Sequence, residues 1–175
     1  MGVLARSVAL LAAVHFVAAC AHASNEYGLK AAFLLNFARY VEWPPAAFSG
    51  ADGPLRIGVA GRDPFDGELD RALAGKSAAG RPLTSRAFSD PSEAHGFHMV
   101  FVSRDQAAQL PALLAAAGTS PVLFVGESDG FCRAGGDIEL YLEDEHIRFR
   151  INPAHSARAG LAISSKLLHL ATLVH

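Results

Sequence analysis

Apolar residues between positions 26 and 42 recur every three to four residues, which predicts a helix. The repeat is carried by Leu29, Phe33, Phe37 and Tyr40, and further apolar residues widen the stripe almost all the way round. A helix of this composition is buried on most sides or pairs with a partner, which leaves a homodimer open. Trp43-Pro44-Pro45 ends the helix, because proline cannot continue its hydrogen-bond ladder.

Short β-prone runs then alternate with helical ones. We expect strands over residues 55–60, 82–88, 98–102 and 121–125. The helices expected between them cover residues 64–74, with Asp63 as a cap, and 105–117, with Pro111 as a candidate kink. This alternation predicts an α/β domain whose mostly parallel sheet is flanked by helices on both faces.

After Gly126 the pattern changes. Residues 138–142 and 147–151 alternate between apolar and polar, and an acidic stretch separates them, which predicts a β-hairpin. Asn152 and Pro153 are typical of a helix N-cap and first helical position. The apolar spacing that follows predicts one long C-terminal helix reaching about residue 174.

The first 23 residues differ from the rest and predict a signal peptide. Arg6 precedes an uncharged, apolar run of about 13 residues, too short for a bilayer span. Ala21-His22-Ala23 predicts cleavage between Ala23 and Ser24, which leaves an α/β domain over 24–175. Residues 17–20 also resemble a lipobox with Cys20 as the lipidated residue, and a buried first helix is the third interpretation.

Composition and charge exclude some classes of function. The chain has a net charge of −2 and no cluster of Lys and Arg, which argues against binding to nucleic acid or anionic membranes. Without Cys20 a single cysteine, Cys132, remains, so no internal disulfide is expected.

Residues 126–130 match the Gly-x-Ser-x-Gly pattern of serine hydrolases. That chemistry needs a helix directly after the turn, and residues 131–136 do not predict one. A serine hydrolase is an alternative function. It would combine Ser128 with one aspartate, Asp137 or Asp144, and one histidine, His155 or His169. No histidine spacing matches a metal site, and residues 58–61 match no phosphate-loop motif, so neither metal nor cofactor is predicted.

Two further features concern binding. Arg148 and Arg150 share one face of the second hairpin strand, where they form a solvent face or contact a protein partner or an anionic ligand. The turns after Val59, Val102 and Val125 would meet at the carboxyl edge of the sheet, where α/β proteins commonly bind small ligands. A periplasmic small-ligand-binding protein is therefore an alternative function.

The chain resembles the YfiR family, also called DUF4154, over nearly all of 24–175. The resemblance is carried by residues 30–44 (KAAFLLNFARYVEWP), 55–65 (LRIGVAGRDPF), 136–152 and 159–171. We refer to the following matching positions as the family signature: Trp43, Pro44, Asn152, Gly160, Leu161, Ser164 and Ser165.

The resemblance implies a periplasmic α/β protein without known catalysis. It implies repression of an inner-membrane diguanylate cyclase by binding its periplasmic sensor region, which lowers cyclic-di-GMP signalling and biofilm formation. An outer-membrane lipoprotein is a second implied partner. Some members of the family carry paired cysteines that form disulfides. This chain, with Cys132 alone, lacks such a pair.

Overall fold

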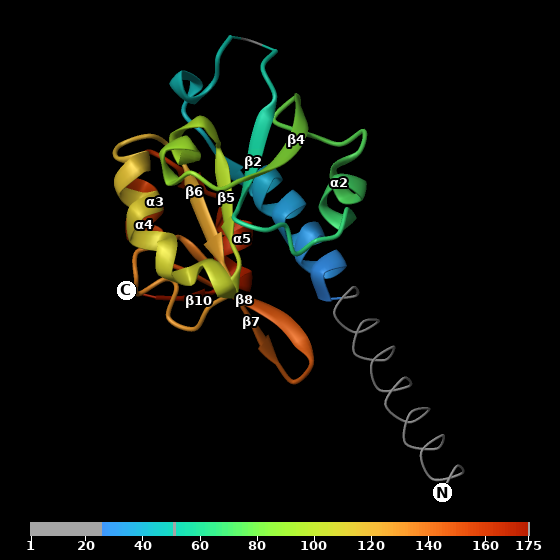
Figure 1. Cartoon of the computed structure of the whole chain (residues 1–175), viewed down its shortest axis with the longest axis vertical. Coiled ribbons are helices and arrows are strands. Elements are labelled where there is room, and N and C mark those ends of the chain that lie inside the picture. The colour runs from blue at the N-terminus through green and yellow to red at the C-terminus, as the bar shows by residue number, and fades with distance from the viewer. Residues whose placement is uncertain (1–25, 51, 175) are drawn as a thin grey trace, which may run out of the picture.

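An eight-stranded sheet forms the centre of the computed structural model, which describes residues 26–50 and 52–174 (Figure 1). The predicted cleavage site between Ala23 and Ser24 and the candidate lipidation site Cys20 lie outside the described residues. The mostly parallel α/β architecture predicted from the sequence is confirmed.

The sheet has the strand order β10-β8-β7-β6-β5-β2-β4-β3. Its strands are β2 (Leu55–Ala60), β3 (Ser77–Ala78), β4 (Arg81–Phe88), β5 (Met99–Val102), β6 (Leu123–Gly126), β7 (Ile138–Glu143), β8 (His146–Ile151) and β10 (Thr172–Leu173). Strands β4, β2, β5, β6 and β7 run parallel, whereas β3 and β8 are antiparallel to their neighbours β4 and β7. The chain leaves β2 toward β4 and returns to β5 on the other side, so the strand order reverses between β2 and β5.

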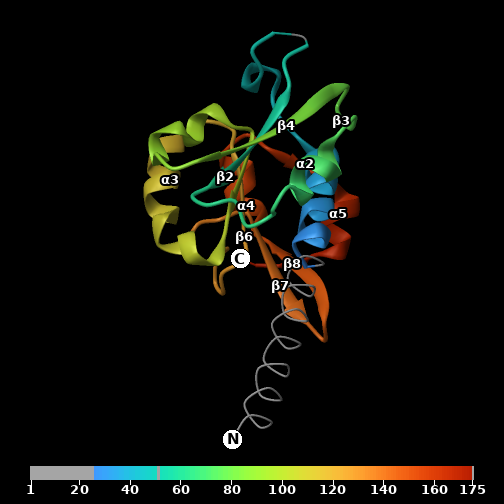
Figure 2. The same cartoon turned by 45° about the vertical axis from the view of Figure 1, so that its right-hand side comes forward.

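Helices cover both faces of this sheet (Figure 2). One face packs against the N-terminal helix (residues 26–40), α2 (Glu68–Leu73) and α5 (Ser165–Leu170), around Phe37, Ile57 and Phe101. The other face packs against α3 (Leu110–Ala117), with Val100, Phe124 and Phe131 in its core. Three 3-10 helices complete the connections: η1 (Pro45–Ala47), η2 (Pro91–Gly96) and η3 (Arg104–Gln109).

The predicted hairpin is confirmed as β7 and β8. It extends one residue beyond the expected strand ends, so that Glu143 pairs with His146. Asp144 and Glu145 form the two-residue turn with φ of 50° and 62°. Turns of this kind match the right-handed twist of the strands, and Asp is among the residues that tolerate the positive φ they require.

The prediction of one long C-terminal helix is wrong. Asn152 does cap a helix, accepting a hydrogen bond from His155 N, but this helix, α4 (Pro153–Arg158), ends after six residues. Gly160 follows with φ of 73°, and β9 (Ala162–Ile163) then pairs with β1 (Val41–Glu42). The pairing of distant segments overrides the helical spacing, and Ser164 starts the separate helix α5 by accepting a hydrogen bond from Leu167 N.

The two inner helices also begin later than predicted. Asp63 accepts a hydrogen bond from Phe65 N at 2.8 Å in a turn before the helix, and α2 starts after Gly67, which has φ of 79°. The 105–117 segment begins as the 3-10 helix η3 and becomes α-helical at Leu110. Pro111 lies in the first turn of α3, where its missing N–H costs nothing, so it starts this helix and does not kink it.

Candidate partner-binding surface

The N-terminal helix is apolar on two sides, and the sheet buries only one of them. Ala31, Leu34 and Phe37 face the core and are fully buried. A second stripe at heptad spacing, formed by Leu29, Phe33, Asn36 and Tyr40, lies on the outer side. Leu29 is 47% exposed and Tyr40 is 41% exposed, so this stripe has no complete cover within the described residues.

A groove runs between this stripe and α5. Its cavity has a volume of about 370 Å³, and Phe149 of β8 forms its floor against the rings of Phe33 and Phe37, at centroid distances of 5.8 and 5.4 Å. We call it the apolar groove, and its lining residues are Phe33, Asn36, Phe37, Tyr40, Phe149, Lys166, Leu167 and Leu170. Leu170 at its edge is 76% exposed.

Exposed apolar residues lie in this groove and along the helix beside it. Among residues 26–50 and 52–174, the exposed large apolar side chains are Leu29, Tyr40, Leu142, Leu170 and Leu173. Tyr40 and Leu170 line the groove, and Leu29 lies on the same stripe of the N-terminal helix, whereas Leu142 of β7 lines a different hollow. Apolar residues concentrated in this way are typical of surfaces that bind another protein.

Contacts between the two ends of the described chain hold the groove in shape. Val41 of β1 pairs with Ile163 of β9, and Ser164 N donates a hydrogen bond to Tyr40 O at 2.9 Å. Trp43 Nε1 donates to His98 O at 3.0 Å, which anchors the chain just after β1 to the central sheet. The end of the N-terminal helix and the start of α5 are therefore fixed to each other.

The family signature marks these same contacts. Asn152 and Ser164 are the N-caps of α4 and α5. Gly160 takes up the left-handed turn between them, close to Pro44, and Leu161 is buried. These positions determine how the ends of the domain close, and they do not line a reactive site.

A comparison with protein-family models shows to which family the chain belongs. The model described as YfiR/HmsC-like (DUF4154) matches residues 27–172, which include both ends of the domain. The chain belongs to the YfiR/HmsC-like family. This is a family of periplasmic regulatory proteins, so regulation in the periplasm is its general class of function.

Two solved structures are similar to this YfiR/HmsC-like chain in fold alone. A conserved domain protein from Vibrio cholerae O1 biovar eltor str. N16961 has 13% identity and a TM-score of 0.54, covering 69% of this chain and 55% of its own. The ABC domain in complex with L-Trp from Streptococcus pneumonia has 12% identity and a TM-score of 0.50, covering 68% of this chain and 55% of its own. The chain thus spans about half the length of both.

No curated protein matches the chain. Over residues 26–50 and 52–174, no helix has the length and apolar character needed to cross a bilayer.

A buried ion pair fixes the first turn of the N-terminal helix of this YfiR/HmsC-like domain. Lys30 Nζ contacts both Glu127, just after β6, and Glu26. Glu127 Oε1 also accepts hydrogen bonds from Tyr27 Oη and Arg104 N, each at 3.0 Å. Burial and the charge of Glu127 raise the pKa of Tyr27 well above its usual value. This network joins the start of the helix to the carboxyl edge of the sheet.

The predicted hydrolase residues do not assemble. Asp137 accepts hydrogen bonds from Phe124 N at 2.8 Å and from Ser156 Oγ at 2.9 Å, so its carboxylate supports the fold and orients no histidine. Within the described part of the chain, Ser128 makes no side-chain hydrogen bond to His155 or His169, and turns follow it in place of the required helix. Asp144 lies in the hairpin turn.

His98 and Cys132 have structural roles, and no metal cluster is found in the described part of the chain. Groups of three or more His, Cys, Asp or Glu that could hold a metal are absent from residues 26–50 and 52–174. His98 is buried, and burial with the nearby Arg56 charge lowers its pKa to about 4. Burial, with the charges of Glu139 and Asp137, raises the pKa of the Cys132 thiol to about 12, so this cysteine is not a nucleophile at neutral pH.

Arg148 and Arg150 share a face of β8, as predicted, and each pairs with an acidic residue of β7. Arg148 Nε lies 2.6 Å from Glu143 Oε2, and Arg150 Nη1 lies 2.6 Å from Glu139 Oε1. The pairing reduces the basic character expected for this face. Their contact with a partner stays a prediction.

The predicted crevice at the carboxyl edge of the sheet is present, next to the reversal of strand order. Its volume is about 780 Å³, and residues after β2, β5 and β6 line it, among them Arg62, Asp63, Arg104 and Asp105. Acidic residues outnumber basic ones in its lining, so its charge favours no simple anion.

Proposed function

We propose that this protein represses an inner-membrane diguanylate cyclase by binding the periplasmic sensor region of that enzyme. The match to the YfiR/HmsC-like family over residues 27–172 carries this proposal. The apolar groove supports it, because an exposed apolar surface beside the closed ends of the domain is suited to binding a protein. On this proposal the protein has no catalytic role and lowers cyclic-di-GMP and biofilm formation.

The groove would accept apolar side chains from an extended or helical segment of the sensor region. Leu170 and Tyr40 provide the exposed apolar contact, and Lys166 and Asn36 provide polar groups at the edge. Burial of apolar surface contributes about 25 cal/mol per Å², so a few side chains that fill the groove supply several kcal/mol. Repression then requires tighter binding to the inactive arrangement of the cyclase than to the active one.

We also propose that the chain reaches the periplasm through its first 23 residues. Cleavage between Ala23 and Ser24 releases a free protein, whereas lipidation at Cys20 tethers it to a membrane leaflet. Mass spectrometry of the protein from a periplasmic fraction distinguishes these forms by their N-terminal residue. An intact Met1 on a cytosolic protein would contradict both.

The direct test measures binding between the purified protein and the periplasmic domain of a GGDEF-type membrane protein encoded beside it. Leu170→Asp places a charge on a side chain that is 76% exposed, so the fold should not change. We expect this variant to raise Kd at least about tenfold, because the carboxylate must lose water on binding. Ala112→Asp, on the opposite side of the sheet in α3, adds the same charge and should leave Kd unchanged.

Cells provide the second readout. Deletion of the protein should raise cyclic-di-GMP, and Leu170→Asp should fail to restore repression where Ala112→Asp succeeds. The proposal is refuted if the purified protein binds no such domain, or if both variants repress equally well. Light scattering on the same samples separates loss of the partner from loss of a homodimer.

A further inference from the structure

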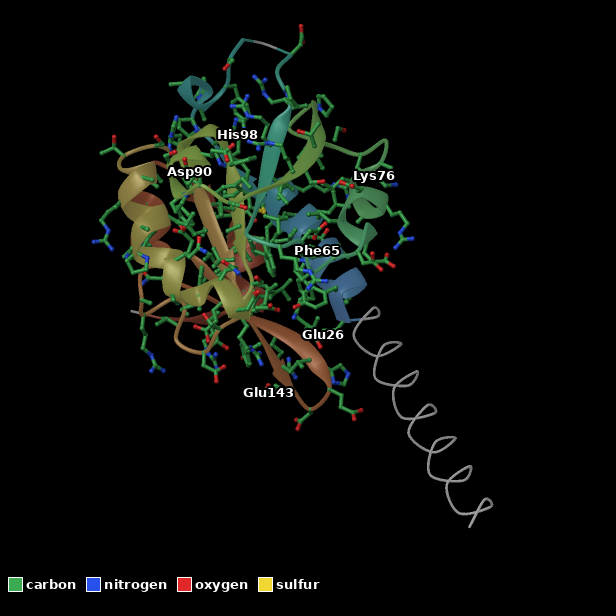
Figure 3. The ribbon with its side chains drawn as sticks, viewed as in Figure 1. Glu26, Phe65, Lys76, Asp90, His98 and Glu143 are labelled. Atoms are coloured by element: carbon green, nitrogen blue, oxygen red, sulfur yellow. The ribbon has the colours of Figure 1, made fainter. Side chains whose placement is uncertain are left out.

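A third hollow lies between the loop after β6 and the outer face of the β7–β8 hairpin, and it shares Arg104 with the crevice. Its volume is about 640 Å³. We call it the arginine hollow, and its charged and aromatic lining consists of Arg104, Asp129, Arg133, Glu139, Tyr141 and Arg150. Glu143, labelled in Figure 3, marks the hairpin that forms one of its walls. This hollow and Phe149 of the groove lie on opposite faces of β8, since Phe149 and Arg150 are neighbours in the strand.

The charges in this hollow are not balanced. Three arginines face two acidic residues, in a chain whose overall net charge is −2. Arg150 is paired with Glu139. Within residues 26–50 and 52–174, Arg104 and Arg133 have no carboxylate within ion-pair distance, although other arginines such as Arg71 and Arg86 do. Like charges in one concavity repel each other, and a bound anion relieves that repulsion.

Buried groups hold two of the three guanidinium groups in place. The Arg150 guanidinium lies 3.7 Å from the centre of the Tyr141 ring and bonds to Glu139, which is only 3% exposed. The second Glu139 oxygen accepts a hydrogen bond from Cys132 N. Arg104 is fixed through its backbone N and its Nη2, which donate to Glu127. Because these arginines are already ordered, a ligand loses less of its binding energy to side-chain entropy.

We propose that the arginine hollow binds a small multivalent oxyanion, a metabolite that carries either a phosphate chain or several carboxylates. Guanidinium groups donate paired hydrogen bonds to phosphate and carboxylate groups. Arg104 and Arg133 supply the free donors, and Arg150 supplies those not used by Glu139. The hollow is large enough for a metabolite of ordinary size. The proposal concerns the free protein and does not depend on the cyclase.

Titration calorimetry of the purified protein at constant ionic strength tests the proposal with two probes, inorganic pyrophosphate and citrate. We expect at least one of them to bind with one-to-one stoichiometry. Binding of pyrophosphate alone identifies a phosphate ligand, and binding of citrate alone identifies a polycarboxylate. Arg133→Gln should raise Kd about tenfold, because it removes charge-assisted hydrogen bonds at an exposed position without affecting the core.

Arg71→Gln is the matched control. Arg71 is an exposed arginine of α2, far from the hollow in sequence and paired with Glu68, so its loss changes the net charge equally. Binding that both variants weaken to the same extent would be a general charge effect and would overturn the proposal. Failure of both probes to bind would overturn it as well. Neither result bears on the cyclase, which the calorimetry does not contain.

Discussion

Acidification should reveal His98 as a buried base that the fold keeps neutral. His98 is 2% exposed. Its Nδ1 accepts a hydrogen bond from Arg56 N at 3.0 Å, so Nε2 carries the proton and donates to Ala47 O at 3.1 Å. The ring stacks on Phe48 with centroids 4.5 Å apart. A second proton on Nδ1 would break the bond from Arg56 N and place a charge beside the guanidinium of the same residue.

The direction of the effect follows from the two pKa values. His98 has a pKa of about 4 in the folded protein and 6.5 when unfolded, so between these values the unfolded chain binds more protons. The free energy of unfolding therefore falls as pH decreases from 6.5 toward 4. Between pH 7.5 and pH 5 the linkage relation gives a loss of about 2 kcal/mol from this group.

Asp137 acts in the opposite direction. Burial raises its pKa to about 6 from 3.8, so the folded state holds a proton that the unfolded state releases. Its contribution to stability is fully present below pH 3.8 and is lost as pH rises through 6. Over the same interval from pH 7.5 to pH 5 it adds about 1.5 kcal/mol, which largely offsets the loss from His98.

Urea unfolding at pH 7.5, 6 and 5 separates the two groups. We expect His98→Gln to gain about 2 kcal/mol of stability relative to wild type between pH 7.5 and pH 5, because the variant lacks the loss from His98 and keeps the gain from Asp137. Glutamine can accept from Arg56 N and donate to Ala47 O, so the variant should fold. His95→Gln, at an exposed position in η2, is the control. Parallel pH profiles for wild type and His98→Gln would refute this reasoning.

Three further predictions concern buried polar groups. Cys132 should not react with a thiol reagent at pH 8 in the native protein but should react fully in urea, because its pKa is raised to about 12. Lys30→Met should lower the free energy of unfolding by about 3–5 kcal/mol, since it leaves Glu127 buried without its cation, and Lys30→Met/Glu127→Gln should recover much of that loss. Asn152→Ala should cost about 1 kcal/mol in urea unfolding by removing the cap of α4, and a cost near zero would contradict the observed hydrogen bond to His155 N.

The sequence predicts elements whose pattern is local. Strand β2 and the hairpin have the expected limits to within a residue, because alternation and turn residues determine them over short distances. The segment after Gly160 was predicted as helix, and its helical spacing is real, since α5 forms there. Its interruption depends on pairing with β1, more than 100 residues earlier in the chain, which no local pattern contains.

The functional surfaces differ in how far the sequence reveals them. The nearly all-round apolar stripe of the N-terminal helix already indicated an unpartnered side, and Leu29 and Tyr40 are exposed on it. The contribution of Leu170 to the same groove could not be foreseen while α5 was part of a longer helix. The sequence indicated the arginine hollow only through Arg150, because Arg104 and Arg133 are far from it in sequence and join it through the order of the strands.

The family signature and the apolar groove have different physical roles. The signature acts within the fold: Gly160 forms a turn, Ser164 and Asn152 cap helices, and Leu161 is buried. The side chains that a partner would touch, above all Tyr40 and Leu170, are not among these positions. The signature sets how the two ends of the domain close, whereas on the proposed function the exposed residues beside them contact the partner. Substitution of exposed residues such as Tyr40 and Leu170 should therefore change partner binding at little cost in stability.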